Sequence, residues 1–411
     1  MKNIKKIFIL SNLGFSVLTY AAGYQIPNHS INANALATAY VANAKGADSA
    51  YYNPANMVHN DSNNALEISL NYVTLDTIAY DSLDHAIHIA SQKNATAIPS
   101  LHYVCAALNR SGIRFGLSMI SPAGLTRQWL QMPAVASAKE YALQTIEINP
   151  SMALALNDKL SLGFGLRYVQ AKGVVQVDGS SLPLNPPNSV PYAMKMKGDA
   201  HSFGYNLALS YTMRDNLNLS ATYRSKVILD LQGDANATVA GVPIASKAAT
   251  RIPIPANLII ALAYRFDNDV TLEMTYDKTL WSVVKQTNFE FDDATLESVL
   301  GKSTPKDWKD THAYRLGITK KYKNTTLMSG LAYSTNAADD QYVSFSSPES
   351  DTYTVSFGFK YRINESMDIG SSVLVARSIK RTVIQEELLG VDGTLGQRDI
   401  YVLNFGLGFT F

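Results

Sequence analysis

The 411-residue chain has little charge, a single cysteine and no long apolar run. Charged residues make up 17% of it, against roughly 25% in an ordinary soluble domain. Lysine plus arginine is 35 and aspartate plus glutamate is 34. The net charge of +1 argues against nucleic acid as the main partner, because binding to phosphates needs clustered excess cation. Cys105 alone allows no disulfide framework and no thiolate metal cluster. A mean hydropathy of -0.04, without an apolar run of about 18 residues, excludes a bundle of membrane helices.

The first 21 residues have the features of a secretory signal peptide. Residues 1–6 are cationic, and residues 7–18 are mostly apolar but too short to cross a bilayer, which takes ~20 residues. Residues 19–21 (TYA) then offer a small-residue cleavage site. We therefore expect an exported mature chain that begins at Ala22. The alternative, a buried N-terminal helix, fits the order of charged, apolar and small residues less well.

From about residue 66 onward, apolar and polar residues alternate in paired runs joined by tight polar turns. One pair spans residues 152–168 around a turn at 157–159, and the next spans 203–224 around 214–216. Alternation over about ten residues indicates a strand with one apolar and one polar face. The runs predict about fourteen strands, an even number as single-chain bacterial barrels require. They start near residues 66, 99, 113, 143, 159, 202, 217, 251, 270, 312, 325, 352, 366 and 398.

The apolar face of these strands could meet either a soluble core or lipid. In a soluble sandwich it is the core, and in an outer-membrane barrel it meets lipid while the polar face lines the lumen. Runs of about ten residues favour the barrel, because soluble strands average five or six. Short turns alternate with long connections, and tyrosines, 23 in all, stand at many strand ends, where amphipathic rings suit a membrane interface. The chain also ends on an alternating strand that closes on Phe411, a pattern associated with assembly into the bacterial outer membrane.

We therefore predict an all-β protein: a transmembrane antiparallel β-barrel of about 14 strands, over residues 66–411, in the outer membrane of a Gram-negative bacterium. The long connections, among them 122–142, 173–201, 233–250 and 278–311, are expected outside. Residues 22–65 do not alternate and are rich in alanine and asparagine. A barrel of this size conducts water unless something fills it. We expect residues 22–65 to form a hatch (plug) inside the lumen; the alternative is a disordered periplasmic tail.

Several short motifs resemble the FadL/TodX outer-membrane transport family, in order along nearly the whole chain. They are AGYQ at residues 22–25, NPA at 53–55, IPSLHY at 98–103, YRSKV at 223–227, IPAN at 254–257 and WKD…AYRLG at 308–317. The resemblance implies a fourteen-stranded barrel with an N-terminal hatch that imports long-chain fatty acids or other hydrophobic molecules. It places Asn53, Pro54 and Ala55 in the hatch. It also implies a kinked third strand that opens the wall sideways to lipid.

The resemblance suggests residues for the ligand's head group. Lys309 matches a basic residue placed near that group, because a buried carboxylate needs a cation or amide donors. A second basic residue of the family falls at or near Gln170 here, so Lys172 or Arg167 would substitute. Ligand would leave through the wall near Pro122 and Gly124, since proline lacks an N–H and glycine tolerates unusual dihedral angles.

Apolar side chains on the expected outer loops are candidates for a first, weak capture surface, because methionine and aromatic side chains adapt to varied ligand shapes. These side chains are Trp129, Leu130, Met132, Val135, Leu182, Leu184, Tyr192, Met194 and Met196. A tighter pocket inside the barrel would then cover the alkyl tail, with each buried CH₂ contributing about 0.8 kcal/mol. Packing of the loops against one another is the alternative role for the same residues.

Signals for an enzyme, a cofactor or a metal are poor. His85 and His88 are spaced like metal ligands, but they have no third carboxylate and fall in a predicted outer loop. No phosphate-binding loop and no nucleophile elbow is present. The partners that we expect are the hydrophobic ligand, outer-membrane lipid, lipopolysaccharide and the barrel assembly machinery, with the protein a monomer. A general diffusion porin, which favours a charged constriction without a hatch, and a barrel lipase or protease remain as alternatives.

Overall fold

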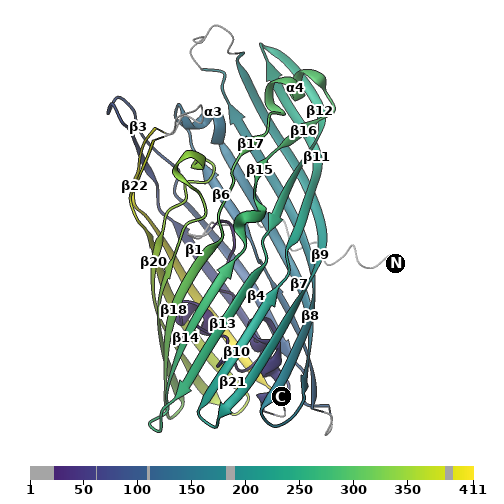
Figure 1. Ribbon diagram of the computed structural model, residues 1–411, viewed down its shortest axis with the longest axis vertical. Coiled ribbons are helices and arrows are strands. Elements are labelled where there is room, and N and C mark those ends of the chain that lie inside the picture. The colour runs from purple at the N-terminus through teal and green to yellow at the C-terminus, as the bar shows by residue number, and fades with distance from the viewer. Residues whose placement is uncertain (1–22, 62, 109–111, 182–189, 385–391) are drawn as a thin grey trace.

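The chain forms a closed antiparallel barrel in a computed structural model that describes residues 23–61, 63–108, 112–181, 190–384 and 392–411 (Figure 1). The expected signal peptide, residues 1–21, lies outside this described part. The wall closes because the first strand, β1 (Ala65–Leu75), pairs with β4 (Asn94–Val104) on one side and with the last strand, β24 (Arg398–Thr410), on the other. The upper end of the barrel in Figure 1 carries the long connections, and the lower end carries short turns.

The described wall contains eighteen labelled strands. Besides β1, β4 and β24 these are β5 (Ile113–Ile120), β6 (Gly124–Gln128), β7 (Glu140–Ala155), β8 (Leu160–Asp178), β9 (Tyr192–Arg214), β10 (Leu217–Arg224), β11 (Val227–Val239), β12 (Val242–Ile254), β13 (Asn257–Arg265), β14 (Val270–Thr279), β16 (Phe289–Phe291), β18 (Thr311–Tyr322), β19 (Thr325–Ser334), β20 (Thr352–Asn364) and β21 (Met367–Ser378). Four wall strands are interrupted and carry two labels each, namely β5/β6, β10/β11, β12/β13 and β14/β16. The eighteen labels therefore make fourteen wall strands, which confirms the predicted barrel.

The remaining described elements are short and belong to the connections or to the hatch. The connections hold β2 (Ala79–Ser82), β3 (His88–Ala90), β15 (Gln286–Thr287), β17 (Thr304–Pro305), β22 (Arg381–Val383), β23 (Gly393–Leu395), α3 (Ala134–Ala138), α4 (Ala294–Leu300), and the 3-10 helices η3 (Trp281–Val283) and η4 (Asp340–Tyr342). The hatch holds α1 (Ile31–Ala35), α2 (Ser49–Tyr52) and the 3-10 helix η2 (Pro54–His59). Within the described residues, no helix has the length and apolar character needed to span a membrane.

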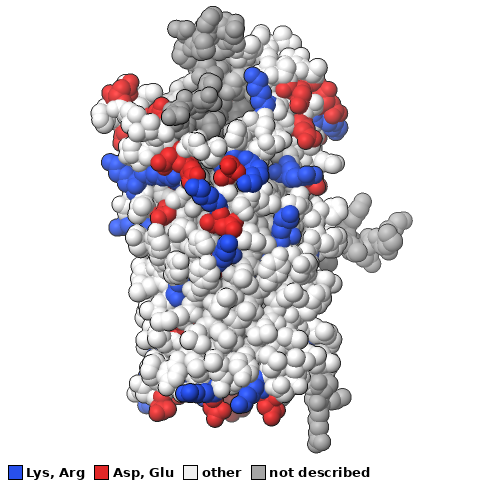
Figure 2. All heavy atoms as spheres, in the orientation of Figure 1, with Lys and Arg blue, Asp and Glu red and all other residues white. Residues whose placement is uncertain are grey.

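Strand β1 shows how the alternation builds the wall. Ile68, Leu70 and Tyr72 point outward and are 46%, 44% and 50% exposed, whereas the intervening Glu67 and Asn71 are buried in the lumen. Figure 2 shows the same pattern over one face of the molecule: a band almost without charge separates a charged lower rim from a charged belt above the middle. The outer face of this band is thus suited to lipid, with polar residues kept inside.

Two of the expected outer loops are shorter than predicted, because the strands continue above the uncharged band. Strand β8 reaches Asp178 and β9 begins at Tyr192, so most of the interval 173–201 is paired strand. The interval 233–250 is likewise the β11–β12 hairpin, with its turn at residues 240–241. The outward side chains of β9 at this height are polar (Lys195, Lys197 and Asp199), so apolar alternation could not reveal the extension.

The hatch crosses the lumen from wall to wall. Its helix α1 packs against β19, β20, β21 and β24, whereas η2 packs against β5, β7, β8 and β9. The side chain of Ser30 caps α1 by accepting a hydrogen bond from the backbone N–H of Ala33 at 3.2 Å. Because a segment that touches both sides of a barrel fills its interior, this architecture matches the plug and not a tail hanging below the barrel.

Candidate functional site

The hatch residues Asn53, Pro54 and Ala55 lie buried at the junction of α2 and η2. The amide of Asn53 donates a hydrogen bond to the carbonyl of Val41 at 2.9 Å, which ties two turns of the hatch together. The hydroxyl of Ser161 on β8 donates to the carbonyl of Ala55 at 2.8 Å. At Gly163 an added Cβ would lie 2.4 Å from the backbone nitrogen of Ala55, so glycine allows the hatch to sit directly on the wall.

Two wall carboxylates also hold the hatch through its backbone. Glu273 on β14 accepts hydrogen bonds from the N–H groups of Val41, Ala42 and Asn43, at 2.5, 2.8 and 3.0 Å. On the opposite wall, Glu67 on β1 accepts a hydrogen bond from a backbone N–H of α1 and a second one from Lys360. The hatch is therefore attached to the wall at separate points, and a few hydrogen bonds hold it at each point.

The wall is interrupted where the third wall strand breaks between β5 and β6. Strand β4 pairs with β5 only over Leu101–Val104, and residues 121–123 separate β5 from β6. The start of the hatch occupies this break: Ile26 donates its N–H to the carbonyl of Pro122 at 3.0 Å, and Gly124 donates to the carbonyl of Tyr24 at 2.7 Å. The hatch thus supplies backbone pairing that the neighbouring wall strand does not.

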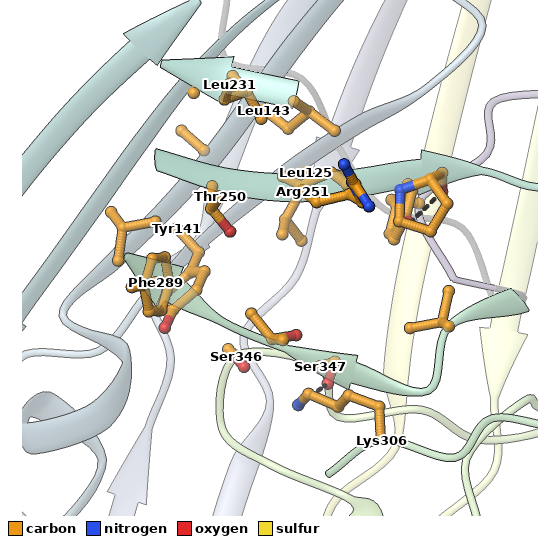
Figure 3. Close-up of a pocket in the computed structure, with 18 of the residues that line it drawn as sticks. Leu125, Tyr141, Leu143, Leu231, Thr250, Arg251, Phe289, Lys306, Ser346 and Ser347 are labelled. Carbon is orange, nitrogen blue, oxygen red and sulfur yellow. Dashed lines mark hydrogen bonds between the residues drawn. The ribbon is translucent and has the colours of Figure 1, made fainter. Parts of the chain in front are cut away.

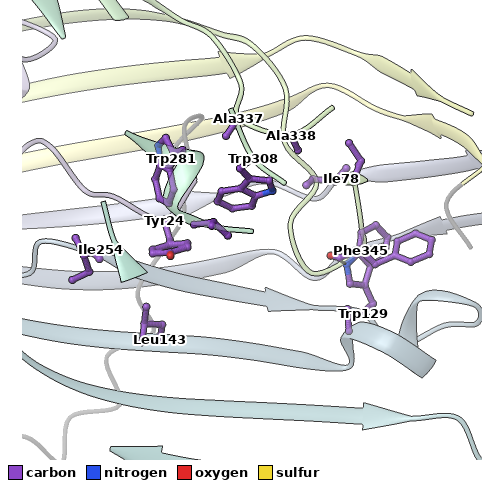
Figure 4. Packing of buried hydrophobic residues seen from close by; sticks show 14 of the residues in the cluster. Tyr24, Ile78, Trp129, Leu143, Ile254, Trp281, Trp308, Ala337, Ala338 and Phe345 are labelled. Atoms are coloured by element: carbon purple, nitrogen blue, oxygen red, sulfur yellow. Dashed lines mark hydrogen bonds between the residues drawn. The ribbon is translucent and has the colours of Figure 1, made fainter. Parts of the chain in front are cut away.

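The same short segment of the hatch also reaches the far side of the lumen. The Tyr24 hydroxyl donates to the carbonyl of Pro253, and the Gln25 amide donates to the carbonyl of Pro255 at 3.2 Å, both next to the interruption between β12 and β13. The Tyr24 ring packs edge-on against Trp281, with ring centroids 4.8 Å apart (Figure 4). We call residues 24–26 the crossbar, since they join two breaks in opposite parts of the wall.

Above the crossbar lies an apolar cavity of about 110 Å³, which we call the upper cavity. Its lining includes Tyr24 and Trp308. Figure 3 labels further lining residues, among them Leu125, Tyr141, Leu143, Leu231, Phe289 and Lys306. Lys306 is buried and donates from Nζ to the hydroxyls of Ser344 and Ser347, at 2.7 and 3.1 Å. Burial lowers the pKa of Lys306 to about 8, an effect that the nearby Glu349 carboxylate opposes. The upper cavity thus combines apolar walls with one desolvated cation.

The residues expected at the head group lie elsewhere. Lys309 is 68% exposed and paired with Asp339 at 2.7 Å, outside the lining of the upper cavity. Lys172 points to the outer surface of β8. Arg167 is buried in the lumen, where it bonds to Glu147 below the crossbar. Sequence reasoning missed Lys306, three positions before Lys309, because the segment between β17 and β18 has no periodicity that tells an inward lysine from an outward one.

The expected capture surface is only partly exposed. Leu130 is 60% exposed and Met132 is half-buried, but Trp129 is fully buried and donates its indole N–H to the carbonyl of Phe345 at 2.9 Å (Figure 4). Tyr192 is half-buried, and Met194 and Met196 are buried within the β8–β9–β11 sheet above the membrane band. Leu182 and Leu184 lie outside the described residues. The capture role therefore stays a prediction, carried mainly by Leu130 and Met132 among the described residues.

A second cavity, of about 80 Å³, lies below the crossbar, and we call it the lower cavity. Its polar lining includes Arg167, Asn206, Thr222, Arg224, Asp277 and Arg315, and it also touches Pro122 at the wall break. The hatch and the wall together enclose it. The site as a whole is therefore an apolar chamber, a crossbar, and a second chamber with apolar and charged lining next to the break in the wall.

The histidines that resemble metal ligands do not converge on a metal site. His88 bonds through Nδ1 to Asp81 on the surface of the β2–β3 hairpin, and both side chains are largely exposed. Across the described ranges, no group of three or more histidine, cysteine, aspartate or glutamate side chains is placed to hold an ion.

Comparison with known proteins gives the same architecture and a family. The chain is 27% identical over 323 residues to the long-chain fatty acid transport protein of Escherichia coli O6:H1, covering 69% of this chain and 71% of that one. A FadL homologue of Pseudomonas aeruginosa aligns with a TM-score of 0.83 at 19% identity, over 95% of this chain and 100% of the other. The Pseudomonas putida toluene transporter TodX aligns with a TM-score of 0.70 at 19% identity, over 95% and 99%.

The family described as "Outer membrane protein transport protein (OMPP1/FadL/TodX)" matches residues 13–402. This match confirms the predicted outer-membrane location and the prediction of a transporter instead of an enzyme. The chain belongs to the FadL/TodX family of outer-membrane transport proteins.

Proposed function

We propose that this protein carries hydrophobic small molecules, long-chain fatty acids among them, across the outer membrane and releases them sideways through its wall. Relatives are named for long-chain fatty acids and for toluene, so both substrate types occur among similar proteins. The observation that carries the proposal is the upper cavity, which is apolar, contains one desolvated cation and is closed below by the crossbar.

Capture would begin on Leu130 and Met132 and continue into the upper cavity. Its volume of about 110 Å³ is smaller than the ~150 Å³ of an apolar protein cavity known to hold benzene. A small aromatic ring or a few methylene groups therefore nearly fill it, and a long acyl chain requires the crossbar or a loop to move. Each methylene that enters contributes about 0.8 kcal/mol, which gives the ligand the free energy to drive that movement.

Lys306 is the residue that we propose for the carboxylate. A charged head group cannot be buried without a partner, and the Lys306 ammonium is the cation in the described lining that is itself desolvated. Movement of Tyr24 and Ile26 would then free the backbone groups of Pro122 and Gly124 and open the wall between β4 and β6. Exit at this point would deliver the acyl chain directly to the lipid around the barrel.

The hatch weighs against a general diffusion porin, because it touches opposite walls and is bonded to both. We further propose that the upper end faces the cell exterior and that the charged belt there meets lipopolysaccharide (Figure 2). We also propose that the barrel assembly machinery inserts this protein into the outer membrane and that the protein is a monomer there.

The test is uptake of labelled oleate in a Gram-negative host that lacks its own fatty-acid channel. Lys306→Met should weaken oleate binding roughly tenfold or more, the effect of losing a charge-assisted hydrogen bond of about 1.5–3 kcal/mol. Toluene uptake should stay unchanged, because toluene has no head group. Lys309→Met serves as the matched control and should behave as wild type. Permeation of sugars into liposomes at the rate of a porin, or oleate uptake no greater than in cells without the protein, would overturn the proposed function.

A further inference from the structure

The lower cavity holds hydrogen-bond donors that have no acceptor. Nη1 of Arg224 and Nδ2 of Asn206 are both buried, both residues line this cavity, and neither atom has a partner among the described residues. Buried donors are satisfied in more than about nine cases in ten, so two in one cavity need an explanation. Donors without acceptors on two residues that line one cavity are an arrangement suited to an oxyanion.

The charges around the lower cavity favour an anion. Glu147 is the carboxylate between two guanidinium groups: Arg167 bonds to its Oε2 through Nε and Nη2, at 3.0 and 2.9 Å, and Arg224 bonds to its Oε1. Arg315 and Asp277 form a separate pair at 3.1 Å, so they cancel. Since Arg167 alone neutralises Glu147, the positive charge of Arg224 is in excess.

The position of the lower cavity connects it with the route of the ligand. It lies beneath the crossbar and touches Ile26 and Pro122, the two residues that close the break in the wall. One of its faces belongs to the hatch, because the guanidinium carbon of Arg224 lies 4.2 Å from the centre of the Tyr51 ring in α2. An anion at Arg224 would therefore contact the wall, the hatch and the approach to the opening.

We propose that the lower cavity is a second carboxylate-binding site, which takes the head group of an anionic amphiphile after it leaves Lys306. The proposal rests on the proposed transport function and identifies anionic amphiphiles as substrates. A carboxylate that leaves Lys306 for the wall opening would otherwise cross a buried region without a partner, which is prohibitive. Arg224 and Asn206 provide that partner, and a neutral hydrophobe has no need of it.

The first experiment separates carboxylates from neutral ligands. Arg224→Gln should lower oleate uptake roughly tenfold, because it removes a charged donor from the path. Toluene uptake and the equilibrium affinity of the purified protein for oleate should both stay within about twofold of wild type, since Lys306 is untouched. Arg224→Lys should restore most of the oleate uptake. Arg377→Gln, which removes an exposed arginine from the outer surface, is the matched control and should have no effect.

Unchanged oleate uptake in Arg224→Gln, or an equal fall for oleate and toluene, would overturn the second site. Failure of the proposed function is distinguishable, because wild-type protein would then show no oleate uptake at all. A measurement on the wild-type protein covers the case in which the variant fails to assemble. Crystals grown in bromide should show an anomalous peak within hydrogen-bonding distance of Arg224 Nη1, and absence of that peak would also overturn the proposal.

Discussion

Removal of the Glu273 carboxylate should release the hatch from one side of the wall. Glu273 accepts three hydrogen bonds from consecutive N–H groups of residues 41–43, and Glu273→Ala leaves those donors without partners. A hydrogen bond to a charged group contributes about 1.5–3 kcal/mol, but three on one carboxylate are not additive. We therefore take about 3 kcal/mol for the loss of the whole contact.

A loss of about 3 kcal/mol raises the ratio of released to attached hatch roughly 150-fold. The assay is single-channel recording in a planar bilayer, where release of the hatch should appear as frequent ion-conducting openings. The matched control is Thr275→Ala: Thr275 is buried two positions further along the same face of β14, and its hydroxyl has no hydrogen-bond partner among the described residues. Ion-conducting openings should stay rare in wild type and in Thr275→Ala. If they were equally rare in Glu273→Ala, the hatch would not depend on this carboxylate, and the reasoning would be refuted.

Three further predictions follow from the same contacts. Because deprotonation of Lys306 begins near its pKa of about 8, the affinity for oleate should fall as the pH rises above 8, by at most about tenfold per unit, while binding of toluene stays constant; calorimetry that finds both ligands insensitive to pH would contradict this. Gly163→Ala should push η2 off the wall at a cost of about 1–3 kcal/mol and speed hydrogen exchange at residues 53–57 roughly tenfold, whereas unchanged exchange would show that the close approach is unimportant. Asn53→Ala should impair oleate uptake while the barrel still assembles, as heat-dependent gel mobility would show, and normal uptake would remove Asn53 from the mechanism.

Much of the wall could be predicted from the sequence because a strand in lipid has a strict period of two. That period predicted the number of wall strands, fourteen, which the structure contains. The same period failed to predict the strands where their outer face is polar. Lys195 and Lys197 point outward on a strand that continues above the membrane band, so most of the expected loop there is paired strand.

The candidate site was less predictable, because its parts come from segments without periodicity. Trp129 is a residue type expected on a capture surface. It is buried instead and packs against the ring of Phe345, a residue 216 positions later in the chain. The crossbar depends on backbone groups of Tyr24 and Pro122 that only the folded barrel brings together. Composition indicated that residues 22–65 fill the lumen, whereas the contacts that hold them there could be found only in three dimensions.

A disulfide across the wall break tests lateral exit most directly. Gln25 and Ala123 form an antiparallel bridge as a non-hydrogen-bonded pair, since the flanking bonds run from Ile26 to Pro122 and from Gly124 to Tyr24. Such a pair places its Cα atoms about 4.5 Å apart, within disulfide range. Gln25→Cys with Ala123→Cys, in a Cys105→Ala background, should block oleate uptake when oxidised and restore it after reduction. Full uptake through the oxidised protein, with the disulfide verified by mass spectrometry, would contradict the account.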